Sequence, residues 1–317
     1  MRLTLNLDED STVKRFASIL LLFCLPTAVP AQTPPTGDAP VTGTILVAHG
    51  ADAEWNAPVH RLAAAAETGG PVEVSLLMGD SATVYRFQDA VDRLVEKGAG
   101  RMVIVPLLAS SHSGHFEQIR YLAGERDTLR PGLLRHLEDA GIHRPTTDVP
   151  MKLTPAIDAS MEIAGIVGDR ALRLATVPAE QSLFVIGHGP GSAEDYAEWM
   201  ANLRPVAAAV QERTGFRDVK IGLVRDDAAA PVRAEAVRRI REIIELQAEA
   251  TGREVVVVPL LISKGYISTR KFPEDLRGLP IAYDGEGLLP HPALAEWIER
   301  RVREAEAELD SGVVAAR

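Results

Sequence analysis

The chain has 317 residues, and its 44 Asp and Glu outnumber its 34 Lys and Arg, which gives a formal net charge of −10 at pH 7. With 46% hydrophobic and 25% charged residues, this composition is typical of a folded globular protein and excludes a mainly disordered or fibrous chain. The acidic balance argues against nucleic acid as a partner, because phosphate contacts need clustered Lys and Arg. The length suggests about two domains.

The N-terminal segment has the pattern of a secretory signal peptide. Its apolar run, residues 16–25, follows two basic residues and is shorter than the roughly 20 residues that a membrane span needs. Ala31 stands where a small residue precedes cleavage, so we expect residues 1–31 to be removed and the mature protein to be exported, into the periplasm, without a membrane span. The acidic residues that precede the run suggest that translation begins at Val13.

The single cysteine, Cys24, lies in this segment, so the mature chain is expected to have no thiol. Any metal site must then use imidazole, carboxylate, thioether or water ligands. This excludes thiolate zinc sites and iron–sulfur clusters.

After a Pro-rich linker over residues 32–43, strands and helices are predicted to alternate. Short apolar runs predict buried strands, and apolar residues at helical spacing predict the helices between them. The first-half elements, in chain order, are a strand over 44–50, a helix over 53–68, a strand over 72–78, a helix with apolar positions 87, 91, 94 and 95, a strand over 101–108 and a helix over 158–174. This alternation predicts an α/β fold with a mostly parallel sheet flanked by helices.

The same order returns in the second half of the chain. Its predicted elements are a strand over 182–189, a helix ending near 214, a strand over 219–223, a helix over 232–250, a strand over 254–262 and a helix over 292–309. Three motifs also recur in one order: a His-Gly after the first strand, a Val-Pro-Leu-Leu in the third and a Leu-x-Pro before the last helix. Such repetition indicates internal duplication. We therefore predict two similar domains over 44–176 and 177–310 and a tail over 311–317, with an extra segment around 124–146.

Several histidines follow the predicted carboxyl ends of strands, where parallel sheets bind ligands. His49 and His188 follow the first strand of each half, and His112 and His115 follow the third strand of the first half. If the first and third strands are neighbours, the three first-half histidines converge on one crevice. Imidazole binds iron, cobalt, nickel and zinc, so the sequence predicts a metal or proton-transfer site there. The alternative for each histidine is a structural hydrogen bond within its loop.

The remaining histidines are weaker candidates. His60 and His136 fall on helical stretches and His143 on the extra segment, where solvated side chains are expected. His291 precedes a helix that has Pro in its first turn, so it is either a second-domain ligand or part of a cap.

Other polar groups point less clearly to a function. Asp80, Asp226 and Asp227 follow strands and are either cation ligands at the rim or ordinary turn residues. Ser110 and Ser111 lack the Gly-x-Ser-x-Gly elbow of a hydrolase. The His-Gly loops match neither a Walker loop nor a dinucleotide fingerprint, so no nucleotide cofactor is expected.

The motifs as a set resemble the CbiX-type class II chelatases. Val47-Ala-His-Gly50, Val105-Pro-Leu-Leu-Ala-Ser-Ser-His-Ser-Gly-His115 and the second Gly187-His-Gly189 carry the resemblance, which spans about residues 44–308. It implies a duplicated α/β fold and insertion of cobalt or iron into sirohydrochlorin without nucleotide hydrolysis.

The resemblance also implies roles for individual histidines. In this family one histidine after the first strand and one after the third bind the metal and take protons from the macrocycle. His49 matches the first, and either His112 or His115 matches the second. In the second half Ile267 stands in the place of the family histidine and His188 stands alone as a further candidate metal ligand. One working site in the first half is therefore expected, with the second half a lid or a vestige.

The sequence thus predicts an exported protein that inserts a divalent metal into a tetrapyrrole. Arg86, Arg120 and Arg270 are candidate countercharges for the carboxylates of the macrocycle. The alternative is an exported metal- or tetrapyrrole-binding protein that has lost turnover, which the absence of a histidine at Ile267 favours.

Overall fold

The computed structural model of the protein describes residues 40–311. The predicted signal peptide with Cys24, the proposed start at Val13, the linker up to residue 39 and the tail beyond residue 311 lie outside this part of the chain.

The first half forms a parallel sheet with the strand order β2-β1-β3-β4. Its strands are β1 (Thr42–Ala48), β2 (Val72–Leu76), β3 (Arg101–Leu107) and β4 (Met151–Leu153). The central strands β1 and β3 are buried along their whole length, which explains their continuous apolar runs. Because β1 pairs with β3, the first and third strands are neighbours, as convergence of the histidines requires.

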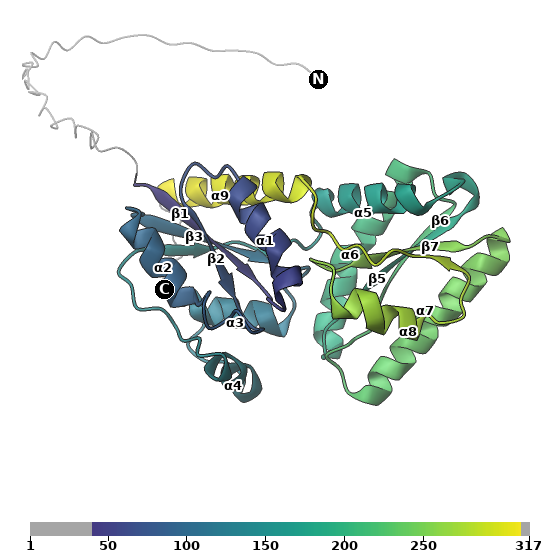
Figure 1. Cartoon of the computed structure of the whole chain (residues 1–317), viewed down its shortest axis with the longest axis horizontal. Helices are drawn as coiled ribbons and strands as arrows, with labels where there is room; N and C mark the ends of the chain where they lie inside the picture. Colours follow the sequence, from purple (N-terminus) through teal and green to yellow (C-terminus); the bar gives the residue numbers. More distant parts are fainter. Residues whose placement is uncertain (1–39, 312–317) are drawn as a thin grey trace, which may run out of the picture. The chain divides into compact units, whose positions relative to one another are not determined.

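The second half repeats this sheet with the order β6-β5-β7-β8. Its strands are β5 (Ser182–Gly187), β6 (Asp218–Leu223), β7 (Val255–Leu260) and β8 (Ile281–Ala282). Two parallel four-stranded sheets of equivalent order confirm the predicted fold class, a duplicated α/β architecture (Figure 1).

Helices cover the sheets and connect the strands. They are α1 (Ala53–Ala65), α2 (Phe87–Glu96), α3 (Gly114–Leu122), α4 (Pro131–Asp139), α5 (Met161–Leu174), α6 (Ala193–Thr214), α7 (Ala230–Thr251), α8 (Phe272–Asp275) and α9 (Ala293–Asp310), with short helical segments η1 (Pro178–Glu180) and η2 (Ile267–Lys271). Helix α3 was not predicted from the sequence, whereas α4 contains the helical stretch expected around His136. No helix within residues 40–311 is long and apolar enough to cross a membrane.

The last helix of each half packs on the other half. Helix α5, which ends the first half of the sequence, contacts α6 and β7, whereas α9, which ends the second half, contacts α1, β3 and β4. In Figure 1, α9 accordingly lies beside the first sheet and α5 beside the second. The domain boundary expected between residues 176 and 177 stays a prediction, and this exchange of helices was not foreseen.

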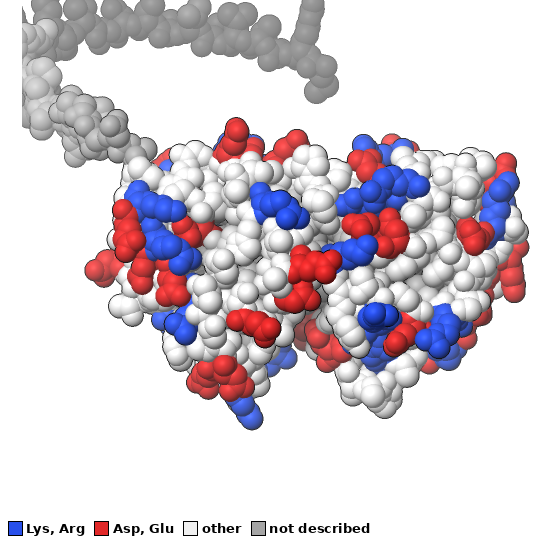
Figure 2. All heavy atoms as spheres, in the orientation of Figure 1, with Lys and Arg blue, Asp and Glu red and all other residues white. Residues whose placement is uncertain are grey.

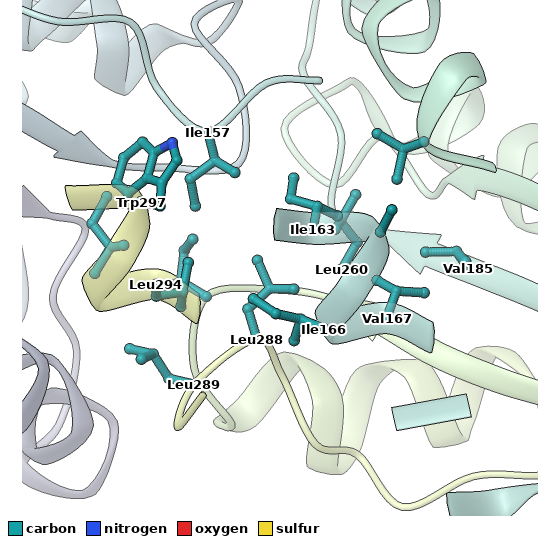
Figure 3. Close-up of a cluster of buried hydrophobic side chains, with 14 of the residues drawn as sticks. Ile157, Ile163, Ile166, Val167, Val185, Leu260, Leu288, Leu289, Leu294 and Trp297 are labelled. Carbon is teal, nitrogen blue, oxygen red and sulfur yellow. The ribbon is translucent and has the colours of Figure 1, made fainter. Parts of the chain in front are cut away.

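The exchanged helices share one hydrophobic core. Ile163 and Ile166 of α5 and Leu294 and Trp297 of α9 are fully buried in a cluster that spans both halves (Figure 3). The outer face of each sheet has a separate core. Burial of this apolar surface holds the halves together and thereby fixes the loops that follow their strands.

Arg101 fastens α9 to the first sheet. Arg101 is buried, with 8% of the residue exposed. Its guanidinium group donates to Thr42 Oγ1 over 2.7 Å and pairs with Asp310 and Glu306 of α9. On the face shown in Figure 2, charged side chains of both signs lie intermixed among uncharged ones.

Candidate functional site

A cavity of about 330 Å³ lies where the loops after the central strands of both sheets meet. The first half contributes His49 after β1 and, from the loop after β3, residues 108–110, Ser113 and His115. The second half contributes His188 after β5, Asp227 after β6 and the segment 260–268 after β7. The site thus lies at the carboxyl ends of parallel strands, where ligands were expected.

His49 is held by the sharp turn at the end of β1. Gly50 has a φ of +83°, and a Cβ there would lie 2.3 Å from the carbonyl oxygen of Met78, so only glycine fits. His49 Nδ1 lies 2.8 Å from the carbonyl oxygen of Gly50, which can only accept. Nδ1 therefore donates, and Nε2 of the neutral ring keeps its lone pair.

His115 approaches His49 from the first turn of α3. The helix begins after Ser113, whose hydroxyl accepts a hydrogen bond from the backbone N–H of Phe116 over 3.2 Å. The rings of His49 and His115 meet edge to face, with centroids 4.6 Å apart. The turn at Gly50 and the helix cap at Ser113 thus place two imidazoles from separate segments side by side.

Burial keeps both rings neutral at neutral pH. Burial, reinforced by neighbouring histidines, lowers the pKa of His49 to about 3. Burial likewise lowers the pKa of His115, although its hydrogen bond to Gln118 opposes the change. Two neutral imidazoles side by side can bind a metal ion without displacing protons.

His112, the alternative partner, does not line the cavity. Its backbone N–H donates to Ser110 Oγ over 3.0 Å at the start of the turn. The neighbouring Ser111 hydroxyl donates to Asp158 over 2.6 Å, which fastens this loop to the loop after β4. The structure therefore places His115, and not His112, beside His49.

His188 lines the same cavity from the second half. Its Nδ1 lies 3.1 Å from the carbonyl oxygen of Gly189, the arrangement of His49, and its Nε2 lies 3.4 Å from Asp226. Asp226 is already paired with Arg233 and Lys271, at 2.6 and 2.5 Å. Although burial opposes it, these cations hold the pKa of Asp226 below its usual value. The Asp226 carboxylate thus has its partners within the protein.

Aromatic and aliphatic side chains form much of the cavity wall. Trp55 and Trp199 line it, and Tyr266, 68% exposed, lies at its edge. Gly265 packs against the Trp55 ring so closely that a Cβ would lie 2.8 Å from Cδ1. Ser263 Oγ also donates to the carbonyl oxygen of Trp55 over 3.1 Å. The segment after β7 thereby closes over the first-half site.

Ile267 lines the cavity as an apolar group on this segment. Among residues 40–311, no group of three or more His, Cys, Asp or Glu side chains is arranged to hold a metal ion. Metal binding by side chains would therefore rest on the His49–His115 pair.

The three predicted countercharges, Arg86, Arg120 and Arg270, do not line the cavity. Arg120 pairs instead with Glu125 at 3.2 Å. Arg130 lines an adjoining cavity of about 480 Å³, which shares His115 with the first. The sequence did not single out Arg130, because a loop arginine carries no local signal of the cavity it faces.

Two weaker histidine predictions have different outcomes. His291 Nδ1 accepts from the backbone N–H of Ala293 over 3.2 Å, which agrees with the cap alternative. The expectation that His136 is solvated is wrong: this α4 residue is partly buried, and its Nδ1 lies 3.1 Å from Gln118 Nε2. The sequence around His136 did not predict this contact, because α4 belongs to the extra segment and the second half offers no equivalent segment for comparison.

Comparison with solved structures shows the same fold in several known proteins. SirB from Bacillus subtilis with Fe³⁺ has a TM-score of 0.59 and 17% identity, over 86% of this chain and 98% of SirB. The sirohydrochlorin chelatase SirB from Bacillus subtilis subspecies spizizenii, in complex with cobalt, has a TM-score of 0.57 and 16% identity, over 86% and 97%. DR2241 from Deinococcus radiodurans, a multi-domain protein with structural similarity to chelatases, has a TM-score of 0.51 and 19% identity, over 84% of this chain and 56% of its own.

No curated protein matches the chain. A family model does: the CbiX model matches twice, over residues 43–174 and 182–305, once in each half. These matches cover most of the sequence and repeat with the two sheets, so the chain belongs to the CbiX family.

Proposed function

We propose that the protein inserts a divalent metal, cobalt or iron, into a sirohydrochlorin-like tetrapyrrole without nucleotide hydrolysis. The observation that carries this proposal is the pair of neutral imidazoles, His49 and His115, with ring centroids 4.6 Å apart in a largely apolar cavity. Membership of the CbiX family supports it. SirB structures of the same fold, with Fe³⁺ and with cobalt, are consistent with iron or cobalt as the metal substrate.

The chemistry needs a metal donor and a proton acceptor. Imidazole nitrogen binds cobalt and iron, and the backbone acceptor at His49 Nδ1 orients Nε2 for this task. Because the pKa of His49 is about 3, protons compete little for its Nε2 at neutral pH. As the metal passes from the two Nε2 atoms to the pyrrole nitrogens, each Nε2 regains its lone pair and would accept one of the two protons that the pyrrole nitrogens release. The carboxylates of a bound macrocycle would raise the pKa of both histidines and so favour this transfer.

The cavity walls suit a flat conjugated substrate. Trp55, Trp199 and Tyr266 offer aromatic surface against which a macrocycle can stack. Arg130, in the adjoining cavity, pairs with Glu117 at 2.8 Å, but its side chain is 58% exposed and keeps further N–H groups for a substrate carboxylate. The second half supplies part of this wall, so its role is that of a lid over a first-half site.

Cobalt insertion into sirohydrochlorin, followed by the absorbance change of the macrocycle, tests the proposal. We expect the protein, with no nucleotide present, to exceed the spontaneous rate. His49→Ala and His115→Ala should return the rate to the spontaneous value, because each removes one of two ligands. His112→Ala, outside the cavity, should keep most of the rate. No acceleration by the unaltered protein would refute chelatase activity.

A binding protein without turnover is the second candidate. It is favoured by Ile267, an apolar side chain on the second-half segment of the cavity in the place of the family histidine. Calorimetric binding of cobalt or tetrapyrrole without acceleration of insertion would select it. We propose either activity for an exported protein cleaved near Ala31, which N-terminal sequencing of the mature form would test.

A further inference from the structure

The geometry points to Gln118 as a positioning residue that fixes the tautomer of His115. Helix α4, in the extra segment, in turn orients Gln118. The tautomer itself follows from the contacts alone. Its consequence for metal binding rests on the proposed function.

The orientation of the Gln118 amide is set by α4. Gln118 is fully buried on α3, and its Nε2 lies 2.8 Å from the carbonyl oxygen of Leu133. A carbonyl oxygen can only accept a hydrogen bond, so the amide nitrogen must face Leu133. Gln118 Oε1 therefore points the other way.

That orientation determines the protonation of His115. Gln118 Oε1 lies 2.9 Å from His115 Nδ1, and an amide oxygen can only accept. Nδ1 must carry the hydrogen, since the opposite tautomer would place two lone pairs against each other. In the neutral ring Nε2 is then left unprotonated, as the ring of His49 is by its bond to Gly50.

The second amide hydrogen of Gln118 also forms a hydrogen bond to α4. Its Nε2 lies 3.1 Å from His136 Nδ1, so His136 accepts through this nitrogen. Leu133 and His136 are three residues apart and lie one above the other on α4. Both hydrogen-bond partners of the buried amide nitrogen thus come from one helix.

Close packing keeps α4 against the start of α3. A Cβ on Gly114 would lie 3.0 Å from the Leu133 side chain, so glycine lets the two helices approach. Leu137 of α4 is fully buried in the same core as Ile119 of α3.

The distribution of α4 along the duplicated chain agrees with this role. Between β7 and β8 the described residues have one continuous helical segment, η2 followed by α8, in the place of α3, and no second helix in the place of α4. The resemblance puts Ile267 of this segment in the place of a histidine. The half that carries His115 also carries the helix that supports its orienting amide. We infer that the extra segment belongs to the site rather than to the surface.

The tautomer can be measured directly. In protein labelled with ¹⁵N-histidine, long-range ¹H–¹⁵N spectra at pH 8 distinguish Nδ1–H from Nε2–H, and the His115 signals are assigned by their loss in His115→Gln. We expect Nδ1–H in the unaltered protein. Finding Nε2–H there would overturn the proposal without any variant of Gln118.

Variants then test whether Gln118 is the cause. Gln118→Met keeps the size of the side chain but removes the acceptor, and should shift His115 toward Nε2–H. Gln247→Met is the matched control, because Gln247 is also buried on a helix and donates to a backbone carbonyl, that of Leu183. Retention of Nδ1–H in a folded Gln118→Met protein would overturn the inference.

Cobalt(II) calorimetry measures the consequence. Loss of an orienting partner of a metal-binding histidine typically weakens metal affinity about 10- to 100-fold, and we expect this for Gln118→Met but not for Gln247→Met. Equal affinity of Gln118→Met and unaltered protein would overturn the positioning role. If the tautomer shifts as expected but the unaltered protein neither binds nor inserts cobalt, the proposed function fails while the assignment of Gln118 stands.

Discussion

Replacing His49 with asparagine should make the protein less sensitive to mild acid. The pKa of His49 is about 3 in the folded protein, against 6.5 for an unperturbed histidine. Below pH 6.5 the unfolded chain therefore binds a proton that the folded protein does not. The folded state has its full stability above pH 6.5 and loses this contribution as the pH falls from 6.5 toward 3.

The size of the effect follows from the width of this window. Each pH unit across which one proton is bound only by the unfolded state costs about 1.4 kcal/mol. Between pH 6.5 and pH 5 the His49 term is about 2 kcal/mol. Asparagine does not titrate, and its amide N–H can replace the His49 Nδ1–H that donates to Gly50. His49→Asn should remove this term while keeping the turn.

Urea unfolding at pH 7.5 and pH 5, followed by tryptophan fluorescence, measures the difference. Between these two pH values the free energy of unfolding should fall by about 2 kcal/mol less in His49→Asn than in the unaltered protein. Titrating groups that are not coupled to His49 are common to both proteins and cancel in the comparison. His143→Asn, at an exposed position on the extra segment, is the control for replacing a histidine with asparagine outside the site. An equal loss of stability in His49→Asn and unaltered protein would refute the low pKa assigned to His49.

Three further substitutions test the packing that forms the site. Gly265→Ala places a methyl group against the Trp55 ring. We expect the free energy of unfolding, measured in urea, to fall by about 1–3 kcal/mol and the tryptophan emission maximum to shift. An unchanged unfolding midpoint and an unchanged spectrum would show that the Trp55 ring moves aside without cost. Trp297→Ala leaves a cavity in the core that both halves share beneath α9 and should lower the free energy of unfolding by about 3–5 kcal/mol. A loss below about 1 kcal/mol would mean that this core does not hold the halves together. Arg101→Met removes the links to Thr42 and Asp310, and calorimetric melting should show a loss of about 1–3 kcal/mol that high salt in the unaltered protein only partly reproduces.

Much of the fold could be predicted from the sequence because its signals are local. The strands β1, β3, β5 and β7 are buried and appear as continuous runs of apolar residues. In α2, Phe87, Val91 and Leu94 are buried as helical spacing requires, although Val95, counted with them, is exposed. Repetition of the motifs then revealed the duplication, and the place of His49 at the end of a strand predicted its position at the site.

The sequence left open which histidine meets His49, because the answer depends on where α3 begins. Ser113 caps that helix, so His115 lies in its first turn and faces the cavity, while His112 stays in the preceding turn. A shift of one residue in the start of a helix turns each side chain by about 100°. Local pattern predicts element boundaries too coarsely to decide this.

The sequence by itself determined the alternation of strands and helices, the duplication and the histidine that ends β1, since each depends on residues that are neighbours along the chain. Only the tertiary structure decided that α5 and α9 exchange sheets, that the segment after β7 closes the cavity, and that Gln118 and His136 stand behind His115. These contacts join segments that are far apart along the chain. They form because apolar faces and buried amides contact residues that tertiary packing brings close, and the local sequence pattern does not specify those residues.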